Sequence, residues 1–353
     1  METPTPLSKK IRGVLIDLSG TLHIGNDEIP GAKKALKKLR AGGLSLRFLT
    51  NTSTKSVRKL LEHLNNSDNS DAPNRLGFGI SSEEMVTSVQ ATADYVRNQN
   101  LTPLLLLEDV SDFGVPFSEN DNSTTHPSGC IAKKKNPTIY NSNPTVAAET
   151  TESLRDDLPF DSVVVGLAPS SFGYEKLNKA FRVLLKHPQN LIAVHNGKYL
   201  RDTDGELSLG PGAFIHALEV ASQCEPARVM GKPSREIFES AMHSLNRCSA
   251  RQESAVKIEN DSRSGADGSS YISETIQPDE VCMIGDDVWV DCQGALEAGI
   301  GRAILVQTGK YRPGDEDRWQ AERDSSDKPL SSGRFLVRPS IVEAIELVLE
   351  LAG

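Results

Sequence analysis

Short apolar runs alternate with longer amphipathic stretches along most of the chain. This alternation is typical of an α/β fold, in which helices cover the faces of a parallel sheet. The runs at residues 13–16 and 44–49 predict the first two strands, and each is followed by polar residues. Further strands are expected at 103–107, 162–166, 191–194, 228–230, 281–284 and 302–306, which is the last clear strand.

Helices are expected where apolar residues recur at a spacing of three or four positions. In the first, at residues 31–40, Ala32, Ala35, Leu36 and Leu39 share one face, and lysines lie on the other. Residues 198–209 predict a hairpin that turns at Asp204 and Gly205. The other helices are expected at 54–64, 82–98, 174–185, 212–222 and 341–351, from residue 234 onward, and between Asp287 and Ala298.

Three segments interrupt this pattern, at residues 65–78, 118–157 and 247–278. They are rich in serine, asparagine, glycine and charged residues. Such segments bury too little apolar surface to offset the entropy lost on ordering. We therefore interpret them as low-complexity insertions that are mobile on the protein surface.

Length and charge narrow the class of protein. The chain has 353 residues, more than one domain usually needs, so two domains or one domain with a large insertion are expected. Its formal net charge of −9 argues against a surface that binds nucleic acid or an anionic membrane, because both need a concentrated positive patch. No apolar run approaches the roughly 20 residues of a membrane-spanning helix. We expect neither nucleic acid nor membrane as a partner.

Cysteine usage bears on the compartment. The chain has five cysteines and no Cys-x-x-Cys pair: Cys130, Cys224, Cys248, Cys282 and Cys292. This pattern is neither a disulfide framework nor a zinc cluster, and it fits a reducing cytosol. We expect a soluble cytoplasmic protein, with the nucleus as the alternative compartment.

Polar residues with useful chemistry follow four of the predicted strands. They are Asp17 with Ser19, Thr50 with Asn51, Lys232, and Asp286 with Asp287 and Asp291. In parallel α/β sheets functional groups gather beyond the carboxyl ends of the strands, so these residues are expected to meet at one edge. Any one of them alone is more often a helix cap or a turn. All four groups in this order are hard to explain as caps.

Together these residue types form a site for phosphoryl transfer. The Asp17 carboxylate can attack phosphorus and form an aspartyl-phosphate, which divides one difficult displacement into two easier ones. Repulsion between this carboxylate and a phosphate must be offset, and Mg²⁺ does so when carboxylates, a carbonyl and waters hold it. The expected metal ligands are Asp17, Asp286 and the backbone carbonyl of Ser19.

The other residues are expected to bind substrate or to orient groups around it. Lys232 offers a compact positive charge to the phosphoryl oxygens during catalysis. The Thr50 hydroxyl and the Asn51 amide donate hydrogen bonds to the same oxygens, and Ser19 lies with them in the substrate-binding set. Asp287 and Asp291 would orient metal-bound water or Lys232 from just outside the metal's ligands.

These four groups resemble the motifs of the haloacid dehalogenase (HAD) superfamily of aspartate-nucleophile phosphatases. The matching stretches are residues 17–21, 50–51, 231–233 and 285–291, and the resemblance covers most of the chain outside the three polar segments. It implies a Rossmann-like core made of residues 1–89 and 221–353. It also implies an inserted α/β cap of the C2 type at residues 90–220.

Ser19 departs from the pattern of the superfamily. Most of its phosphatases have an aspartate two residues after the nucleophile, which protonates the leaving group and then activates water. The metal ligand survives this change because it is a backbone carbonyl, but the proton donor does not. A positioned acid contributes about 10²–10⁴-fold, so pyrophosphate, P–N compounds and aryl or acyl phosphates should be favoured over substrates with poor leaving groups. The alternative is a catalytically weak protein of this type that acts as a binding or regulatory module.

Partners and two histidines complete the expectations. The expected partner is a small phosphorylated substrate or a phosphoamino acid, and a homodimer through the cap is an arrangement that the resemblance allows. His23 follows the nucleophile loop and is as well explained by packing as by substrate contact. His195 lies in the expected cap, and packing is the stronger interpretation for it.

Overall fold

The computed structural model describes residues 10–65, 76–113, 159–201, 206–260, 275–324 and 333–353. Contacts between residues divide the chain into two compact units. Unit 1 comprises residues 1–50, 58–87 and 232–353, and unit 2 comprises residues 51–57 and 88–231. Along the chain, unit 2 is therefore inserted between segments of unit 1. The expected cap at 90–220 lies within unit 2.

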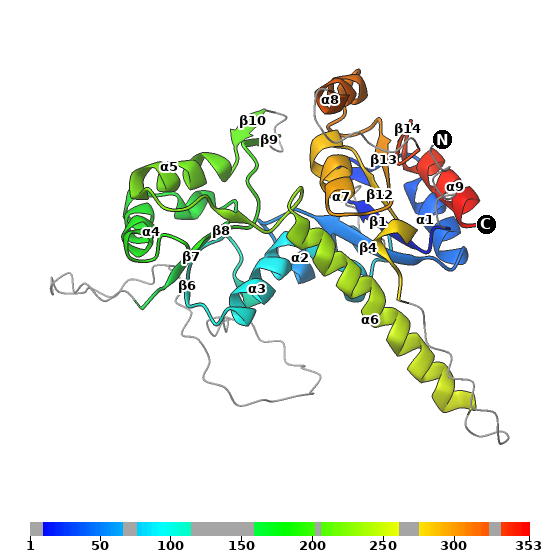
Figure 1. Ribbon diagram of the computed structural model, residues 1–353, viewed down its shortest axis with the longest axis horizontal. Helices are drawn as coiled ribbons and strands as arrows, with labels where there is room; N and C mark the ends of the chain where they lie inside the picture. Colours follow the sequence, from blue (N-terminus) through cyan, green and yellow to red (C-terminus); the bar gives the residue numbers. More distant parts are fainter. Residues whose placement is uncertain (1–9, 66–75, 114–158, 202–205, 261–274, 325–332) are drawn as a thin grey trace, which may run out of the picture. The chain divides into compact units, whose positions relative to one another are not determined.

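Unit 1 is built around a parallel sheet with the strand order β14-β13-β12-β1-β4-β5 (Figure 1). Strand β1 lies between β12 and β4, so that Gly13 is paired with Val281 on one side and Ser45 on the other. Every residue of β1, β12 and β13 is buried, as expected for parallel strands whose two faces are both covered. The strands are β1 (Gly13–Asp17), β4 (Ser45–Thr50), β5 (Met85–Thr87), β12 (Val281–Gly285), β13 (Arg302–Val306) and β14 (Phe335–Arg338), with a small antiparallel pair, β2 (His23–Ile24) and β3 (Asp27–Glu28).

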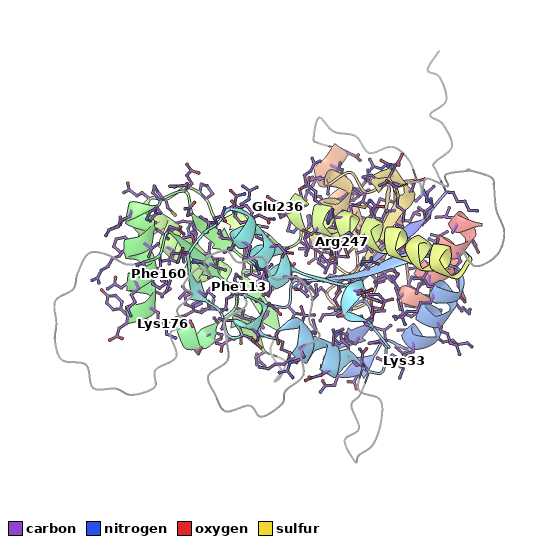
Figure 2. The ribbon with its side chains drawn as sticks, turned by 90° about the horizontal axis from the view of Figure 1, so that it is seen from below. Lys33, Phe113, Phe160, Lys176, Glu236 and Arg247 are labelled. Carbon is purple, nitrogen blue, oxygen red and sulfur yellow. The ribbon has the colours of Figure 1, made fainter. Side chains whose placement is uncertain are left out.

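Helix α6 anchors one face of this sheet. Phe238 and Leu245 of α6 belong to an apolar cluster with Leu15, Leu49 and Met283 of the strands. Figure 2 labels Glu236 near the start of this helix and Arg247 farther along it. The helices of unit 1 are α1 (Ala32–Ala41), α2 (Val57–Asn65), α6 (Arg235–Asn260), α7 (Gly294–Glu297), α8 (Asp315–Asp324) and α9 (Ile341–Ala352), with the turns η1 (Ser82–Glu84) and η4 (Pro278–Glu280) and the π-helix η5 (Val288–Gln293).

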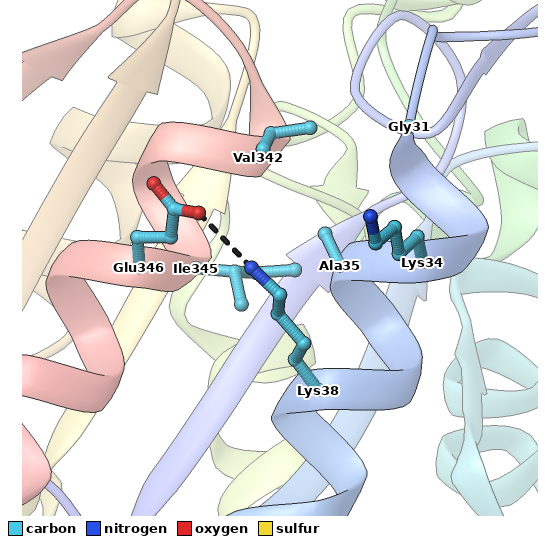
Figure 3. A pocket seen from close by; sticks show the side chains of 7 residues that line it. All are labelled: Gly31, Lys34, Ala35, Lys38, Val342, Ile345 and Glu346. Atoms are coloured by element: carbon cyan, nitrogen blue, oxygen red, sulfur yellow. Dashed lines mark hydrogen bonds and ion pairs between the residues drawn. The ribbon is translucent and has the colours of Figure 1, made fainter.

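Helices α1 and α9 pack side by side (Figure 3). Lys38 of α1 and Glu346 of α9 form an exposed ion pair at 3.2 Å. Beside this pair lies a pocket of about 190 Å³, whose lining includes Gly31, Lys34 and Val342. The pocket contains none of the acidic residues that the strand ends predict.

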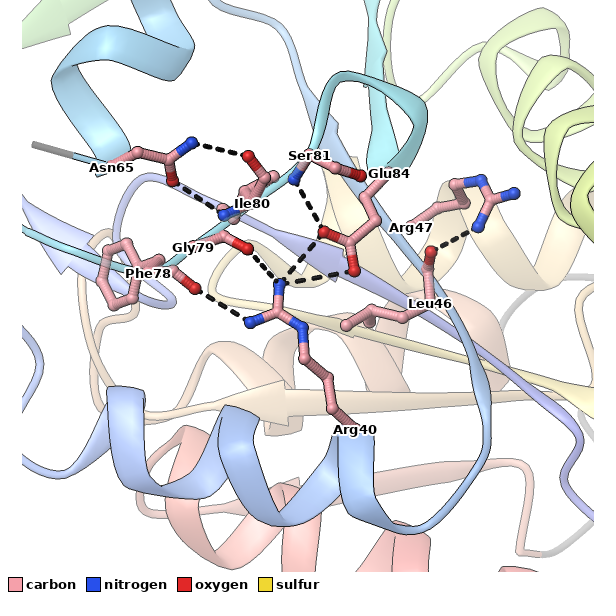
Figure 4. A network of polar contacts seen from close by, with 9 residues as sticks. All are labelled: Arg40, Leu46, Arg47, Asn65, Phe78, Gly79, Ile80, Ser81 and Glu84. Carbon is pink, nitrogen blue, oxygen red and sulfur yellow. Dashed lines mark hydrogen bonds and ion pairs between the residues drawn. The ribbon is translucent and has the colours of Figure 1, made fainter.

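Arg40 joins the end of α1 to residues 78–84 (Figure 4). Its guanidinium donates to the carbonyl oxygens of Phe78 and Gly79 at 2.9 and 3.1 Å, and to Glu84 Oε2 at 3.1 Å. Asn65 forms a pair of hydrogen bonds with the backbone of Ile80, at 2.6 and 2.7 Å. These bonds hold both ends of the segment whose middle, 66–75, lies outside the described residues.

Unit 2 is a second α/β layer structure, with a parallel sheet in the order β11-β8-β7-β6. Leu104 and Leu106 of β6 face the helices α4 and α5, while Leu105 and Leu107 face α3. Phe113 joins the α3 side and Phe160 the α4–α5 side; both are labelled in Figure 2. Its elements are α3 (Ser88–Asn98), β6 (Pro103–Leu106), η2 (Ser111–Phe113), β7 (Ser162–Val165), η3 (Pro169–Ser171), α4 (Tyr174–Lys186), β8 (Leu191–Ala193), β9 (Tyr199–Arg201), β10 (Leu207–Leu209), α5 (Gly212–Ser222) and β11 (Arg228–Val229).

The α/β fold class is confirmed, but three expectations about elements are wrong. The single helix expected at 82–98 is a 3₁₀ turn, the strand β5 and then α3, because Met85 to Thr87 pair with β4 and the sheet overrides helical periodicity. The strand at 302–306 is not the last, since β14 follows it. An additional helix, α8, whose pattern is almost wholly polar, lies between them.

The third difference concerns the polar segments. Residues 247–260 continue α6 instead of beginning an insertion, because each added residue of an established helix gains a hydrogen bond. Leu76 and Phe78, at the end of the first segment, are buried. The segment 118–157 and the turn at Asp204 and Gly205 lie outside the described residues. Within the described part of the chain, no helix is both long and apolar enough to cross a membrane.

Candidate active site

Asp17 is the last residue of β1, near the centre of the unit 1 sheet, and its exposed fraction is 6%. Both of its carboxylate oxygens are bonded. Lys232 Nζ donates to Oδ1, and the Thr21 hydroxyl donates to Oδ2 at 3.3 Å. These bonds fix the orientation of the carboxylate at the carboxyl edge of the sheet.

Lys232 is buried and serves two acids. Besides Asp17, its ammonium forms an ion pair with Asp291 Oδ1 at 2.7 Å and donates to the Leu49 carbonyl at 3.4 Å. Burial by itself lowers the pKa of Lys232, but the charges of Asp17 and Asp291 outweigh it and raise the pKa. Lys232 is therefore a permanent cation at neutral pH.

Three buried aspartates converge next to this lysine. Carboxylate oxygens of Asp17, Asp286 and Asp291 all lie within 4.8 Å of one another. Burial, together with the charges of Asp17 and Asp291, raises the pKa of Asp286 well above its ordinary value. Like charges this close are unfavourable unless a cation or protons neutralise them.

Asp286 follows β12 and is held on one oxygen only. Its Oδ2 accepts a hydrogen bond from the Lys310 backbone N–H at 2.6 Å. Its Oδ1 is buried and accepts no hydrogen bond from the residues described. A buried carboxylate oxygen left in this way, beside two further carboxylates, is the donor set that a hard divalent cation such as Mg²⁺ prefers. The residues present therefore fit a metal ion.

Two glycines make room around Asp286. Gly20 has φ +94° and Gly309 has φ +60°, and both adopt the left-handed conformation that favours glycine. A Cβ atom added to either would collide with Asp286 Oδ2. Thr308 Oγ1 donates to the Gly20 carbonyl at 2.6 Å and joins the two loops. The backbone thus closes tightly around this carboxylate.

Asp287 and Asp291 have distinct local roles. Asp287 Oδ1 accepts from the backbone N–H groups of Trp289 and Val290, at 3.1 and 3.0 Å, and so caps the π-helix η5. Asp291 Oδ2 accepts from the Asp287 N–H at 3.1 Å. Asp291 therefore lies among the converging carboxylates, whereas the Asp287 side chain is bonded to the helix that follows.

The other expected site residues lie nearby in the chain or in unit 2. Ser19 is exposed in the loop after β1, two residues from Asp17. Thr50 is the buried last residue of β4, which pairs with β1. Asn51 belongs to unit 2, where its Oδ1 lies 2.6 Å from the position of a Cβ atom built on Gly231.

The two histidines are bonded within their own surroundings. His23 Nδ1 lies 2.8 Å from the Gly25 carbonyl, and its ring contacts those of His63 and Phe78. In unit 2, His195 Nε2 lies 3.0 Å from Ser53 Oγ.

Sequence reasoning assigned no role to Thr21 or Lys310. Thr21 lies within the motif at 17–21, and its spacing of four residues from Asp17 gives no sign of a bond to it. Lys310 follows β13, so the rule that functional groups gather beyond strand ends could have found it.

Comparisons with known proteins identify the family of this chain. Residues 14–110 match the family described as haloacid dehalogenase-like hydrolase, and residues 229–326 match the family described as HAD-hydrolase-like. Haloacid dehalogenase-like hydrolase domain-containing protein 2 of Bos taurus is 36% identical over 310 residues, covering 88% of this chain and 89% of that protein. Phospholysine phosphohistidine inorganic pyrophosphate phosphatase of Mus musculus is 31% identical over 320 residues, covering 89% of this chain and 89% of that protein.

Solved structures share the fold at lower identity. The p-nitrophenyl phosphatase from Archaeoglobus fulgidus has a TM-score of 0.64 and 20% identity, covering 96% of this chain and 100% of that one. The 4-nitrophenylphosphatase from Thermotoga maritima has a TM-score of 0.62 and 19% identity, covering 96% and 97%. The chain therefore belongs to the haloacid dehalogenase-like hydrolase family, which confirms the resemblance and the enzyme class expected from its motifs.

Proposed function

We propose that the chain is a Mg²⁺-dependent phosphatase that transfers a phosphoryl group first to Asp17 and then to water. The observation that carries this proposal is the buried convergence of Asp17, Asp286 and Asp291 beside Lys232. The relative named phospholysine phosphohistidine inorganic pyrophosphate phosphatase supports the same class of reaction.

In the first step a carboxylate oxygen of Asp17 forms a bond to phosphorus, and the bond to the leaving group breaks. The leaving group departs with that electron pair. In the second step water attacks the aspartyl-phosphate, releases inorganic phosphate and restores the carboxylate. Lys232 holds Asp17 in place, and Thr50 and Asn51 would donate hydrogen bonds to the phosphoryl oxygens.

Asp17, Asp286 and the backbone carbonyl of Ser19 would hold the Mg²⁺ ion. When bound, the ion offsets the negative charge shared by the nucleophile and the phosphate. Asp291 pairs with Lys232 and keeps that ammonium oriented toward Asp17. Asp287 supports the same loop through its cap on η5.

Ser19 gives the proposal its substrate preference. A serine hydroxyl cannot replace a carboxylic acid as proton donor near neutral pH, and a missing acid costs about 10²–10⁴-fold when the leaving group needs protonation. We therefore propose pyrophosphate, P–N compounds and aryl or acyl phosphates as the favoured substrates. The predicted homodimer and the cytoplasmic location stay predictions.

The direct test measures phosphate release from pyrophosphate and from p-nitrophenyl phosphate with MgCl₂. The wild-type chain should hydrolyse both, and Asp17→Asn should lower turnover by at least about 10³-fold. The exposed acid Asp27 supplies the matched control, since Asp27→Asn makes the same chemical change outside the acid cluster. Undiminished turnover in Asp17→Asn, or undiminished turnover of the wild type in excess EDTA, would contradict the proposal.

Ser19 also favours a second candidate, a weakly catalytic member of the family that acts as a binding or regulatory module. This candidate predicts little turnover even with activated substrates. The Ser19→Asp variant distinguishes the two. If the wild type is inactive and Ser19→Asp gains activity toward ordinary phosphomonoesters, the missing proton donor explains the weakness and the binding module is favoured.

A further inference from the structure

The segment after β13 brings a second lysine to the acidic site of unit 1. Thr308 Oγ1 bonds the Gly20 carbonyl in the nucleophile loop at 2.6 Å, and the Lys310 N–H bonds Asp286 Oδ2 at 2.6 Å. Gly309, between them, packs so closely that a Cβ atom would strike Asp286. The backbone of Lys310 is thereby fixed against a proposed metal ligand.

The Lys310 side chain differs from that of Lys232 in its exposure to solvent and in its ion pairing. Lys232 is buried and engaged by Asp17 and Asp291, whereas Lys310 is exposed and forms no ion pair with any carboxylate among the described residues. Its surroundings are nevertheless acidic. Partial loss of water around the Lys310 ammonium by itself lowers the pKa of this exposed lysine, and the charges of Asp286, Asp17 and Asp291 more than reverse this effect. Lys310 is therefore a cation close to the acids that forms no ion pair with them among the described residues.

A charge count indicates what this cation is for. Four carboxylates raise the pKa of Lys310 through their charge: those of Asp17, Asp286, Asp287 and Asp291. The positive groups beside them are the ammonium groups of Lys232 and Lys310, so four negative charges face two positive ones. One divalent cation neutralises the remaining two negative charges. The site would then be neutral before a substrate arrives, and Lys310 would be an exposed positive group that an additional anion can reach.

We propose that Lys310 binds the leaving group of the substrate when that leaving group carries its own negative charge, as the departing phosphate of pyrophosphate does. The proposal rests on the phosphatase function proposed above and narrows its substrate class to phosphoanhydrides of this kind. As the Asp17–phosphorus bond forms, the bond from phosphorus to the bridging oxygen breaks. The bridging oxygen keeps the electron pair, and the Lys310 ammonium donates a hydrogen bond to a charged non-bridging oxygen of the departing phosphate.

This role is consistent with the lack of a carboxylic acid at Ser19. A phosphate group leaves as a stable anion, so a fixed cation can replace the proton that an alkoxide leaving group requires. The positive charge of Lys310 thus compensates for the missing proton donor at Ser19, and no proton is transferred.

The first test compares Lys310→Met, Lys310→Arg and wild type on pyrophosphate and on p-nitrophenyl phosphate. Loss of a charge-assisted hydrogen bond should lower kcat/KM for pyrophosphate by about 10- to 100-fold in Lys310→Met. Activity on p-nitrophenyl phosphate, which has no second phosphoryl group, should fall less than about threefold. Lys310→Arg should recover most of the pyrophosphate activity. Lys37→Met, an exposed lysine of α1, controls for the change in net charge.

The second test needs no turnover. Binding of imidodiphosphate and of inorganic phosphate is measured by calorimetry with MgCl₂, in the Asp17→Asn background with and without Lys310→Met. We expect Lys310→Met to weaken imidodiphosphate binding about 10-fold or more and to leave phosphate binding nearly unchanged.

The outcomes separate the two proposals. Equal losses on both substrates, or unchanged imidodiphosphate binding, would overturn the role of Lys310 while leaving the phosphatase proposal in place. If the wild type releases phosphate from neither substrate, the phosphatase proposal fails. The imidodiphosphate comparison then still decides whether Lys310 binds a second phosphoryl group.

Discussion

The Nζ of Lys232 donates a hydrogen bond to Oδ1 of Asp17, although 215 positions separate the two residues in the chain. Both side chains are buried: the side chain of Lys232 is 3% exposed, and that of Asp17, taken without its backbone, is 9% exposed. The same ammonium also pairs with Asp291. One cation therefore serves two buried carboxylates, and its removal leaves both of them without their shared partner.

This arrangement predicts that Lys232→Met destabilises unit 1 strongly. Removing one partner of a buried ion pair costs about 3–5 kcal/mol, because the remaining charge stays buried and unpaired. The free energy of unfolding is measured in urea with EDTA at neutral pH, by tryptophan fluorescence. Both tryptophans, Trp289 and Trp319, belong to unit 1 and report on it directly.

The matched control is the exposed pair Lys38–Glu346 in the same unit, in which both side chains are 51% exposed. Lys38→Met should change the free energy of unfolding by at most about 1 kcal/mol, as is usual for surface pairs. A Lys232→Met variant as stable as this control would contradict the assigned role of Lys232.

Asp286→Asn should remove most of the stabilisation of the protein by Mg²⁺. In the wild type, a metal that binds only the folded state adds about 2.7 kcal/mol at a concentration 100 times its Kd. The asparagine removes both a ligand and one of three repelling charges, so the variant should be at least as stable as the wild type in EDTA and gain little from MgCl₂. Thermal unfolding with EDTA and with MgCl₂ measures both effects. Asp27→Asn is the control, and an equal gain in Asp286→Asn would exclude Asp286 as a ligand.

Much of the fold follows from local sequence pattern. Each face of the unit 2 sheet is made by alternate residues, as in Leu104 to Leu107, and such runs identify buried strands directly. The elements that were wrongly assigned are those that tertiary contacts decide. Met85 to Thr87 suit either state locally, and only their pairing with β4 makes them a strand.

The candidate site, like the fold, has features that the sequence predicts and features that depend on tertiary contacts. Asp17 and Asp286 could be predicted because each lies at the end of an apolar strand of the unit 1 sheet, and parallel topology brings such positions to one edge. Lys232 follows β11, which belongs to the unit 2 sheet, so strand order in one sheet does not account for its place beside Asp17. The bond from Thr21 to Asp17 and the approach of Gly309 to Asp286 could not be found, because they depend on how two loops fold against each other. Their chemistry is visible only in three dimensions.

Gly309→Ala should weaken metal binding because the new methyl group would collide with Asp286, although no metal ligand is itself replaced. The added methyl group would displace the Asp286 carboxylate, and changes next to a ligand of this kind typically cost 10- to 100-fold in metal affinity. Gly43→Ala is the control: Gly43 has φ +72°, close to the +60° of Gly309, but its Cβ would meet nothing within 4 Å. Both variants carry the backbone strain of about 1–2 kcal/mol, and only Gly309→Ala should raise the Kd for Mg²⁺. Equal Kd values in the two variants would show that the close approach does not matter.

Ser340→Ala should destabilise unit 1 in a way that depends on pH. Ser340 caps α9: its hydroxyl accepts from the Val342 N–H at 3.1 Å and donates to Glu343 Oε2 at 2.6 Å. Losing such a cap costs about 0.5–2 kcal/mol. The bond from Ser340 lowers the pKa of Glu343 below its ordinary value of 4.5, so this part of the stability is complete above that value and is lost as the pH falls through the lowered pKa.

The gap in unfolding free energy between Ser340→Ala and wild type should therefore be widest near neutral pH and narrow as the pH falls below about 4.5. Urea unfolding followed by tryptophan fluorescence over this pH range measures it. Ser170→Ala, at an exposed position of unit 2, should leave the unfolding of unit 1 unchanged at every pH. A gap that stays constant across the range would mean that Ser340 acts only through the Val342 N–H, because that bond does not titrate.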